Sequence, residues 1–345
     1  MGLYNHMLRL TAKYTSFFIR KTITLSVFFT VWLPSTAPCL AVEDNADDAD
    51  APQYGRIIVW GDFHLEEFGN STLYTYMAIN GSYRQVSTSS GSSIIALRAP
   101  GFPTGEIVSW GESAPEMPDA LTSKKIISVE NGGGWALALD ADGRLYEWGR
   151  NPDRKSSPPP EGRFVDIAAG GLAGYAITEE GRLHAWGRPG YGAIRDAPKG
   201  NFRKVVASGF RAASIDTDGR IHEWGEKPRY KTGVLDPTPE GEFEDVAVGH
   251  IHNVAIDTDG QLHSWGVQHH ELGELYEVPE GRFTAVAAGM HFSMAIDVEG
   301  RLHVWGVTDA TNALSHTPHG RRVLAIAAGP SHGVAILAPD EPWTP

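Results

Sequence analysis

Four histidines recur at intervals of 38 to 41 residues and are the first group that could do chemistry, because imidazole binds Zn²⁺ and exchanges protons near neutral pH. Each stands two residues before a Trp-Gly pair; they are His184, His222, His263 and His303. Tyr146 and Ile58 fill the same place in other copies. A position that accepts Tyr and Ile belongs to a strand pattern, so we interpret these histidines as structural.

Two Asp-Thr-Asp-Gly segments, residues 216–219 and 257–260, bring together carboxylates that could bind Ca²⁺. A calcium loop of the EF type needs a third oxygen ligand before the glycine and a glutamate after it, and both are missing. Asp instead closes turns on its own backbone, and Gly tolerates positive φ. The sequence therefore predicts a hairpin turn at each place and no metal site.

Two polar clusters, residues 62–67 and 269–271, contain His, Asp and Glu side chains suited to acid–base work. Both follow a Trp-Gly pair, where exposed polar loops are expected in any case. The chain has no phosphate-binding loop or dinucleotide fingerprint. We therefore predict no catalytic residue, no metal and no cofactor, and a protein that is not an enzyme.

These residues are set in a repeat that must position them. Seven Trp-Gly pairs, separated by 50, 38, 38, 38, 41 and 40 residues, begin at Trp60, Trp110, Trp148, Trp186, Trp224, Trp265 and Trp305. A unit of this length cannot bury its apolar surface alone, so the copies must pack on one another. Short apolar runs bounded by Gly fill each unit and read as strands that are too short for helices. The predicted fold is all-β.

The two ends of the repeat array complement each other. Residues 323–337 begin a last unit, but the chain stops before its Trp-Gly strand, whereas the first unit has only that strand. Residues 55–61 match residues 300–306 nearly residue for residue, and a closed ring would protect strand edges from aggregation. We therefore predict that residues 54–337 form a seven-bladed β-propeller closed by a split blade. Residues 68–86 fit either an enlarged loop or a decayed blade segment.

The repeat combines Ala-Ala-Gly-x-x-His, Asp-Gly-x-Leu-His and Trp-Gly. In this combination residues 54–337 resemble the regulator of chromosome condensation repeat family, and the resemblance implies a seven-bladed propeller closed by a split blade. Short units joined by Pro-Glu-Gly turns are most similar to the secreted bacterial branch of that family, which includes a propeller inhibitor of β-lactamases. The repeat histidine is kept at His252 and His332 and is replaced in the other units.

The N-terminal residues read as a targeting sequence. Residues 1–41 have a basic start, an apolar run over residues 22–33 and small residues up to Ala41, which is the pattern of a secretory signal peptide. This pattern predicts a secreted or periplasmic protein with no stable membrane span after cleavage. Residues 42–53 are an acidic linker by composition, and residues 338–345 form a C-terminal tail.

Cleavage after Ala41 would remove Cys39, the only cysteine, which excludes disulfides and thiolate metal sites in the mature chain. Residues 42–345 hold 25 basic and 42 acidic residues, a net charge of −17. A surface of this charge repels phosphate backbones, so we expect no nucleic-acid partner.

One loop varies strongly between units and directly follows the Gly that ends each first strand. Its residues include Trp135, Leu172, Phe210, Arg211, His250, Ile251, Met290, His291 and Phe292. Ring closure would bring these loops to one face, and large apolar, aromatic and Arg side chains anchor protein interfaces. Alternatively, Trp135 and Phe292, at the repeat-histidine position, pack between blades, and the same alternative holds for Phe210, Met290 and His291.

The leading hypothesis is a monomeric, non-enzymatic propeller that binds a partner protein through this face. The family resemblance implies a sharper version, inhibition of a secreted enzyme such as a β-lactamase. The resemblance also implies an alternative, a guanine-nucleotide exchange factor-like regulator of a small GTPase. A further alternative is a lectin-like carbohydrate binder, since repeated Trp and Tyr can stack on sugar rings, although the Trp-Gly tryptophans are better explained as core.

Overall fold

The computed structural model of the chain describes residues 54–61, 63–64, 72–73, 77–89, 93–100, 107–111, 113–149, 158–227, 234–268, 276–307 and 317–339. The predicted signal peptide, the acidic linker and most of the predicted C-terminal tail lie outside these residues. The described part is all-β, as predicted, apart from a short 3₁₀ helix, η2 (Asp119–Leu121). No helix in the described ranges is both long and apolar enough to cross a bilayer.

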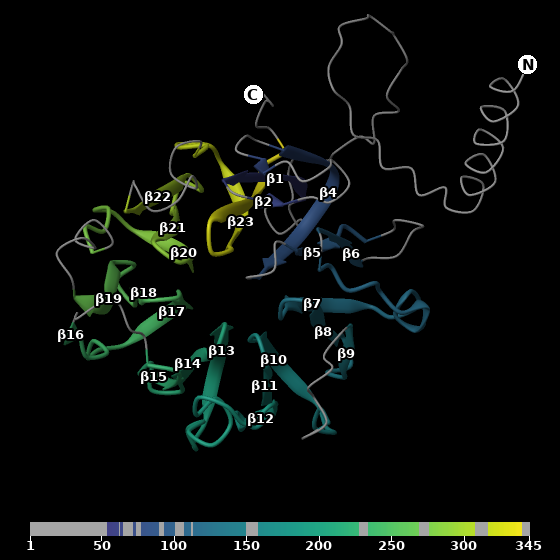
Figure 1. Cartoon of the computed structure of the whole chain (residues 1–345). Helices are drawn as coiled ribbons and strands as arrows, with labels where there is room; N and C mark the ends of the chain where they lie inside the picture. The colour runs from purple at the N-terminus through teal and green to yellow at the C-terminus, as the bar shows by residue number, and fades with distance from the viewer. Residues whose placement is uncertain are drawn as a thin grey trace, which may run out of the picture. The chain divides into compact units, whose positions relative to one another are not determined.

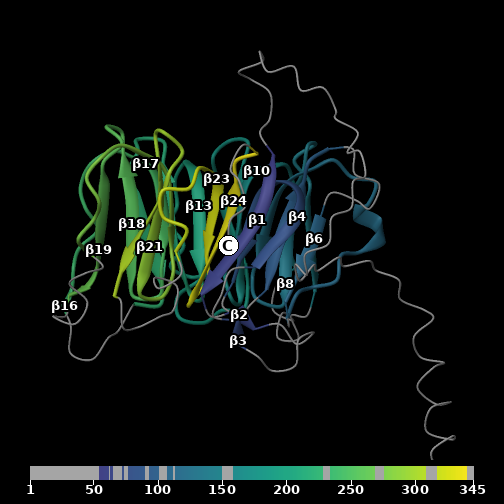
Figure 2. The ribbon, with the colours of Figure 1, turned by 90° about the horizontal axis from the view of Figure 1, so that it is seen from above.

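Each repeat folds into a small antiparallel sheet. In the repeat that begins at Phe164, β10 (Phe164–Ala169) pairs with β11 (Ala173–Thr178), and β11 pairs with β12 (Leu183–Gly187). The first apolar run of the repeat is therefore β10, the second is β11, and the alternating run that ends in Trp-Gly is β12. Seen from the side, the strands of the repeat sheets run between the same two edges (Figure 2).

The same unit recurs along the chain with little change. Three further sheets have three strands: β7 (Ile126–Asn131), β8 (Trp135–Asp140) and β9 (Leu145–Gly149); β13 (Phe202–Ser208), β14 (Arg211–Asp216) and β15 (Ile221–Gly225); and β20 (Phe283–Ala288), β21 (Phe292–Asp297) and β22 (Leu302–Gly306). A fourth sheet, of β17 (Phe243–Val248), β18 (His252–Asp257) and β19 (Leu262–Gln268), adds the short strand β16 (Val234–Leu235) outside β19. A short pair consists of β2 (Phe63–His64) and β3 (Thr72–Leu73).

The Asp-x-Asp-Gly segments form the hairpin turns that the sequence predicts. Between β14 and β15, one carboxylate oxygen of Asp216 accepts the backbone N–H groups of Asp218 and Arg220 at 3.0 and 2.9 Å. The other oxygen lies 2.7 Å from Nε2 of His222, and Gly219 has a φ of +84°. The same pattern joins Asp257 to His263 and Asp297 to His303, with Asp–His distances of 2.7 and 2.8 Å. Each of these three histidines therefore has a carboxylate partner within its own hairpin.

The core lies between neighbouring sheets rather than within one sheet. Trp186 of β12 is buried with Trp135, Leu137 and Leu139 of the preceding sheet. Its ring covers the second-strand residue opposite, Gly174, where an added Cβ would lie 2.4 Å from the ring. Each sheet therefore completes its core only against its neighbour, as expected for a repeat fold.

The first strands of the sheets contact one another in an unbroken cycle around a central axis (Figure 1). The order is β4, β7, β10, β13, β17, β20, β23 and again β4. Side chains link several of these neighbours. Gln85 accepts a hydrogen bond from the backbone N–H of Val129 at 3.1 Å, and Asp166 accepts one from the backbone N–H of Val205 at 2.7 Å. These bonds fix the inner strands relative to one another.

The remaining strands form one six-stranded sheet in which the first and the last of the described strands pair. Its order is β23 (Val323–Ala328), β24 (His332–Leu337), β1 (Gly55–Gly61), β4 (Met77–Thr88), β5 (Ile94–Arg98) and β6 (Ile107–Trp110). Ile57 lies opposite both Ile336 of β24 and Ile79 of β4. The first part of β4 pairs with β1 and the second part with β5, so residues 77–86 of the ambiguous stretch 68–86 are strand.

Removal of residues 54–61 should abolish the native monomer, because β1 occupies the space between β24 and β4 and buries Trp60 over Gly333. The deleted chain should unfold or self-associate through the two exposed edges, as measured by thermal denaturation and size-exclusion chromatography. Removal of residues 42–50 is the control and should change the melting temperature little. Equal stability of the two truncated proteins would contradict this role of β1.

Candidate protein-binding face

The loops that follow the first strands meet along one edge of the molecule, which we call the loop face. Backbone hydrogen bonds join loops of neighbouring sheets to one another. They run from the N–H of Gly171 to the carbonyl of Gly209 (2.6 Å), from His250 to Gly289 (3.1 Å) and from Met290 to Pro330 (3.1 Å). Third strands end at the same edge, as Gly187 opposite Ala173 illustrates. The backbone bonds join the loops in two groups, and Nη1 of Arg211 links these groups by donating a hydrogen bond to the carbonyl of Gly249.

The nine predicted site residues all lie at or directly below the loop face, but their exposure differs. His250 is exposed, and the partly exposed residues are Leu172, Phe210, Met290 and His291. The buried residues are Trp135, Arg211, Ile251 and Phe292. A buried side chain cannot offer contact area to a partner without rearrangement. The interface hypothesis therefore narrows to the first five residues.

Trp135 and Phe292 turn inward because a glycine in the loop before each of them leaves room for the ring. A Cβ on Gly132 would lie 2.2 Å from the ring of Trp135, and a Cβ on Gly289 would lie 2.2 Å from that of Phe292. Nε1 of Trp135 also donates a hydrogen bond to the carbonyl of Gly171, in the next sheet, at 3.3 Å. Both rings therefore pack between sheets, as in the alternative interpretation of the sequence.

The two retained repeat histidines are buried at the equivalent position. Nε2 of His252 lies 2.7 Å from the hydroxyl of Ser293, and Nε2 of His332 lies 2.7 Å from that of Thr88. In each case the hydroxyl belongs to the neighbouring repeat. Burial lowers the pKa of His252 to about 3 and that of His332 to about 4. Both rings are thus neutral at physiological pH and join repeats rather than exchange protons.

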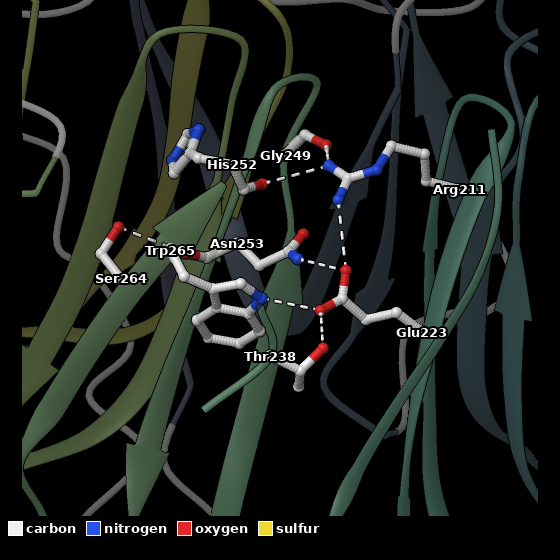
Figure 3. A network of polar contacts seen from close by, with 8 residues as sticks. All are labelled: Arg211, Glu223, Thr238, Gly249, His252, Asn253, Ser264 and Trp265. Carbon is white, nitrogen blue, oxygen red and sulfur yellow. Dashed lines mark hydrogen bonds and ion pairs between the residues drawn. The ribbon is translucent and has the colours of Figure 1, made fainter. Parts of the chain in front are cut away.

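Arg211 takes the same position in its own repeat and anchors a polar network below the loop face (Figure 3). Its Nη1 donates to the carbonyls of Gly249 at 2.7 Å and His252 at 3.3 Å, and its Nη2 lies 3.4 Å from Glu223. The side chain of Arg211 is only 8% exposed. A buried guanidinium of this kind requires an anionic partner, and Glu223 supplies it.

Glu223 holds the network together and was missed by the sequence reasoning. Its two oxygens accept hydrogen bonds from three further side chains: Asn253 at 2.7 Å, Thr238 at 2.6 Å and Trp265 at 2.7 Å. The sequence held a signal for this role, because Glu223 directly precedes a Trp-Gly pair, as Glu147 does. Glu147 accepts a hydrogen bond from Nε1 of Trp186 at 3.0 Å. Glu at this place ties the sheet to the tryptophan of the next one.

Tyr191 is a second residue that the sequence reasoning missed. It lies in the segment that follows Trp186, and its ring stacks on Phe210 with centroids 4.6 Å apart and planes inclined by 29°. Among the described residues it is the one non-glycine with positive φ, at +54°. Pro189 and Gly190 before it and Gly192 after it mark a turn, but they do not reveal which loop the ring would meet.

The inner strands carry a row of charged side chains. Lys204 of β13 forms a 2.7 Å ion pair with Asp245 of β17. Burial opposes the charge on Lys204, but the carboxylates of Asp245, Asp166 and Glu130 outweigh it and raise the pKa of Lys204. Burial also raises the pKa of Asp166 to about 6, although the N–H of Val205 favours its charged form. The positive charge of Lys204 and the negative charges of these carboxylates thus stabilise one another between neighbouring first strands.

Glu130 of β7 lies in the same row, and among the described residues no basic side chain forms a hydrogen bond with it. Burial raises its pKa to about 8, against the effect of the Ser87 hydroxyl, which donates a hydrogen bond to it at 3.0 Å. Glu130 therefore binds a proton in the folded protein at neutral pH.

The described residues include no cluster of three or more His, Cys, Asp or Glu side chains placed to hold a metal ion. The polar cluster at residues 269–271 lies outside the described residues. The side chains of the cluster at residues 62–67 also lie outside the described part of the chain.

Comparison with known proteins agrees with this architecture. The regulator of chromosome condensation (RCC1) repeat matches residues 164–193, the repeat that contains β10, β11 and β12. Among curated proteins, none matches the chain significantly in sequence.

Solved structures show the same fold at low sequence identity. Human WBSCR16 is 14% identical, with a TM-score of 0.65 over 83% of this chain and 100% of its own. Yeast RCC1 (Prp20), solved bound to Kap60, is 14% identical, with a TM-score of 0.64 over 91% and 97%. Prp20p from Saccharomyces cerevisiae, described with its binding to Gsp1p and histones, is 16% identical, with a TM-score of 0.62 over 84% and 93%. The chain therefore shares the β-propeller fold of these structures.

Glu223→Ala should destabilise the protein by about 2 kcal/mol, because Arg211 would remain buried without its carboxylate and two buried donors would lose their acceptor. Urea unfolding measures the change. Glu226→Ala, at an exposed position three residues on, is the control and should change stability by less than about 0.5 kcal/mol. Equal effects of the two substitutions would show that the network in Figure 3 contributes no stability.

Glu130→Gln should stabilise the protein increasingly as pH rises. The folded-state pKa of Glu130 lies above its usual value of 4.5. The contribution of Glu130 to the free energy of unfolding is therefore complete below pH 4.5 and is lost as pH rises through about 8. Gln stays neutral throughout and avoids this loss. The gain in unfolding free energy over wild type should therefore be larger at pH 8.5 than at pH 5, as urea titrations can measure. A difference that is constant with pH would contradict the raised pKa.

Proposed function

We propose that the described strands form a seven-bladed β-propeller closed by a split blade, in which β23, β24 and β1 belong to one blade. The cyclic contacts of the first strands and the pairing of β1 with β24 support this interpretation. The six-stranded sheet then contains two blades. Its strand β4 is the outer strand of the split blade and continues as the inner strand of the next blade.

We further propose that this propeller is a monomeric, non-enzymatic scaffold that binds a partner protein through the loop face. One observation carries the proposal: large side chains reach the surface on loops that hydrogen bonds join to the loops of neighbouring repeats. They are Leu172, Phe210, His250, Met290 and His291. Loops held in place by their neighbours lose little conformational entropy on binding, which favours protein recognition at such a rim.

The partners of the polar residues also support a role without catalysis. His222 and His263 each bond the Asp of their own hairpin, in different sheets. His252 and His332 are held neutral between repeats. Each imidazole has a structural partner, so none of these pairs converges on a common substrate position.

Export is the third part of the proposal, and residues 1–41 support it through their basic, apolar and small-residue regions. The partner would then be another exported protein. The sharpest version is inhibition of an exported enzyme such as a β-lactamase, supported by the similarity of the short Pro-Glu-Gly-linked units to the secreted bacterial branch. Prp20p, a protein of this fold, binds Gsp1p and histones, which supports protein recognition in general.

The test uses the exported chain and a panel of β-lactamases and other exported proteins from the same cells, with affinity measured by surface plasmon resonance. The double variant Phe210→Ala, Met290→Ala should weaken binding of the partner at least about 100-fold, since two interface anchors are lost. The matched control is Ile127→Ala, Val298→Ala, which truncates two exposed apolar residues at the opposite edge. It should leave affinity unchanged.

Equal affinity of both double variants would move the binding site away from the loop face. Accelerated release of labelled GDP from a small GTPase, or binding to a glycan array without any protein partner, would replace the proposal by an exchange factor or by a lectin.

A further inference from the structure

The turn formed by residues 190–197 carries an exposed aromatic ring and an exposed ion pair. Its aromatic residue, Tyr191, is 59% exposed, the largest exposed fraction among the large hydrophobic residues in the described ranges. The ring of Tyr191 stacks on Phe210 with centroids 4.6 Å apart, so its exposed surface lies on the side away from Phe210. We call Tyr191 and Phe210 the aromatic pair.

Hydrogen bonds hold this turn in place. The carbonyl of Ala193 accepts two of them, from the buried hydroxyl of Tyr175 at 3.0 Å and from Nε1 of Trp224 at 3.0 Å. Ala193 itself is buried, and its N–H donates to the carbonyl of Gly190 at 3.0 Å. The ring of Tyr191 is thus displayed by an ordered turn.

The backbone of Tyr191 is strained. A φ of +54° is unfavourable for a bulky residue, whereas Gly at this position would adopt it freely. The phenol ring gains little burial from this conformation, because most of it faces solvent. Strain of this kind at an exposed aromatic residue points to recognition rather than to folding.

Open space borders both members of the aromatic pair. Tyr191 directly follows Gly190, and Phe210 directly follows Gly209. An added Cβ on either glycine would meet no other atom of the described residues within 4 Å. A flat ligand can therefore approach the pair from these sides without displacing a side chain.

The ion pair of the turn joins Arg195 to Asp196 through two hydrogen bonds. Nε and Nη2 of Arg195 donate to the two carboxylate oxygens at 2.7 and 2.9 Å, and the two side chains are 82% and 45% exposed. The hydrogen bond from Arg195 holds the pKa of Asp196 below its usual value. Oδ2 of Asp196 lies against Gly192, where an added Cβ would be 2.2 Å away, and Gly192 is the residue next to Tyr191.

We propose that this turn binds an uncharged carbohydrate, with the C–H face of one sugar ring against Tyr191 and adjacent hydroxyls on the pair of Arg195 and Asp196. The face of an aromatic ring carries a partial negative charge, which attracts the weakly positive C–H groups of a sugar. The guanidinium donates and the carboxylate accepts, so together they serve both roles of a hydroxyl group. This binding site goes beyond the proposed protein recognition and does not rest on it.

An uncharged sugar fits these features better than an ion or an apolar side chain does. Arg195 and Asp196 neutralise each other, so the pair selects neither an anion nor a cation. The whole chain has a net charge of −13, which repels nucleotides and other phosphates at long range. An apolar side chain of a protein would cover the ring but would offer the ion pair no hydrogen bonds in place of water.

The test is an array of uncharged oligosaccharides, built from glucose, galactose, mannose or N-acetylglucosamine, probed with the full exported chain. Isothermal titration with the best oligosaccharide at millimolar concentration then compares variants. Tyr191→Gly, which removes the ring and accepts the positive φ, should weaken binding at least about tenfold, whereas Tyr191→Phe should retain it. Failure of every oligosaccharide to bind, or binding that Tyr191→Gly leaves unchanged, would overturn the proposal.

The ion pair has its own matched substitutions. Asp196→Asn should weaken binding of the same oligosaccharide severalfold, because a neutral amide is a weaker acceptor than a carboxylate. The control is Asp218→Asn, since Asp218 pairs with Arg220 at 3.1 Å in a hairpin turn at the opposite edge, with both side chains 68% exposed. It should leave the affinity unchanged. Equal losses from the two substitutions would contradict a role for the pair in the turn.

The outcomes also separate this site from the proposed protein interface. If Tyr191→Gly weakens binding of the protein partner and no oligosaccharide binds, the exposed ring belongs to the protein interface and this inference fails. If an oligosaccharide binds through Tyr191 and Asp196 and no protein binds the loop face, this inference stands and the proposed function fails.

Discussion

The packing of each sheet against its neighbour is the constraint on which the rest of the structure depends. A three-stranded sheet of this size cannot bury both faces, so Trp186 must cover Gly174 and meet the preceding sheet. The same requirement holds between the first and the last of the described strands, where Trp60 covers Gly333. An open array would leave one such face exposed, and the meeting of β1 with β24 removes it.

This constraint also divides the loop face between core and surface. The first residue of each second strand is the position from which a side chain can turn under its own loop, and Trp135, Arg211, His252 and Phe292 all do so. The residue before it is partly exposed at Leu172, Phe210 and His291, but it is buried at Ile251. Exposure at this position therefore differs between repeats, and sequence variability alone does not separate structural from displayed residues.

Most of the fold could be predicted from the sequence, because the fold is periodic. The Trp-Gly spacing, the Asp-x-Asp-Gly hairpins and the similarity of residues 55–61 to residues 300–306 are local signals repeated many times. The site was less predictable because its geometry comes from contacts between loops. Tyr191 reaches Phe210 only through the way two loops meet, and Glu223 serves Arg211 and Trp265 from different strands. The contacts of Tyr191 with Phe210 and of Glu223 with Trp265 both cross from one repeat to the next, so the pattern within one repeat does not reveal the partner.

The account depends most directly on β1 being an inner strand of its sheet, and native-state hydrogen exchange can measure this amide by amide. The N–H groups of residues 57–60 should exchange as slowly as those of residues 334–336 in β24, because both strands lie between two hydrogen-bonded neighbours. Rapid exchange throughout residues 57–60, with β24 still protected, would contradict the closure and with it the loop face.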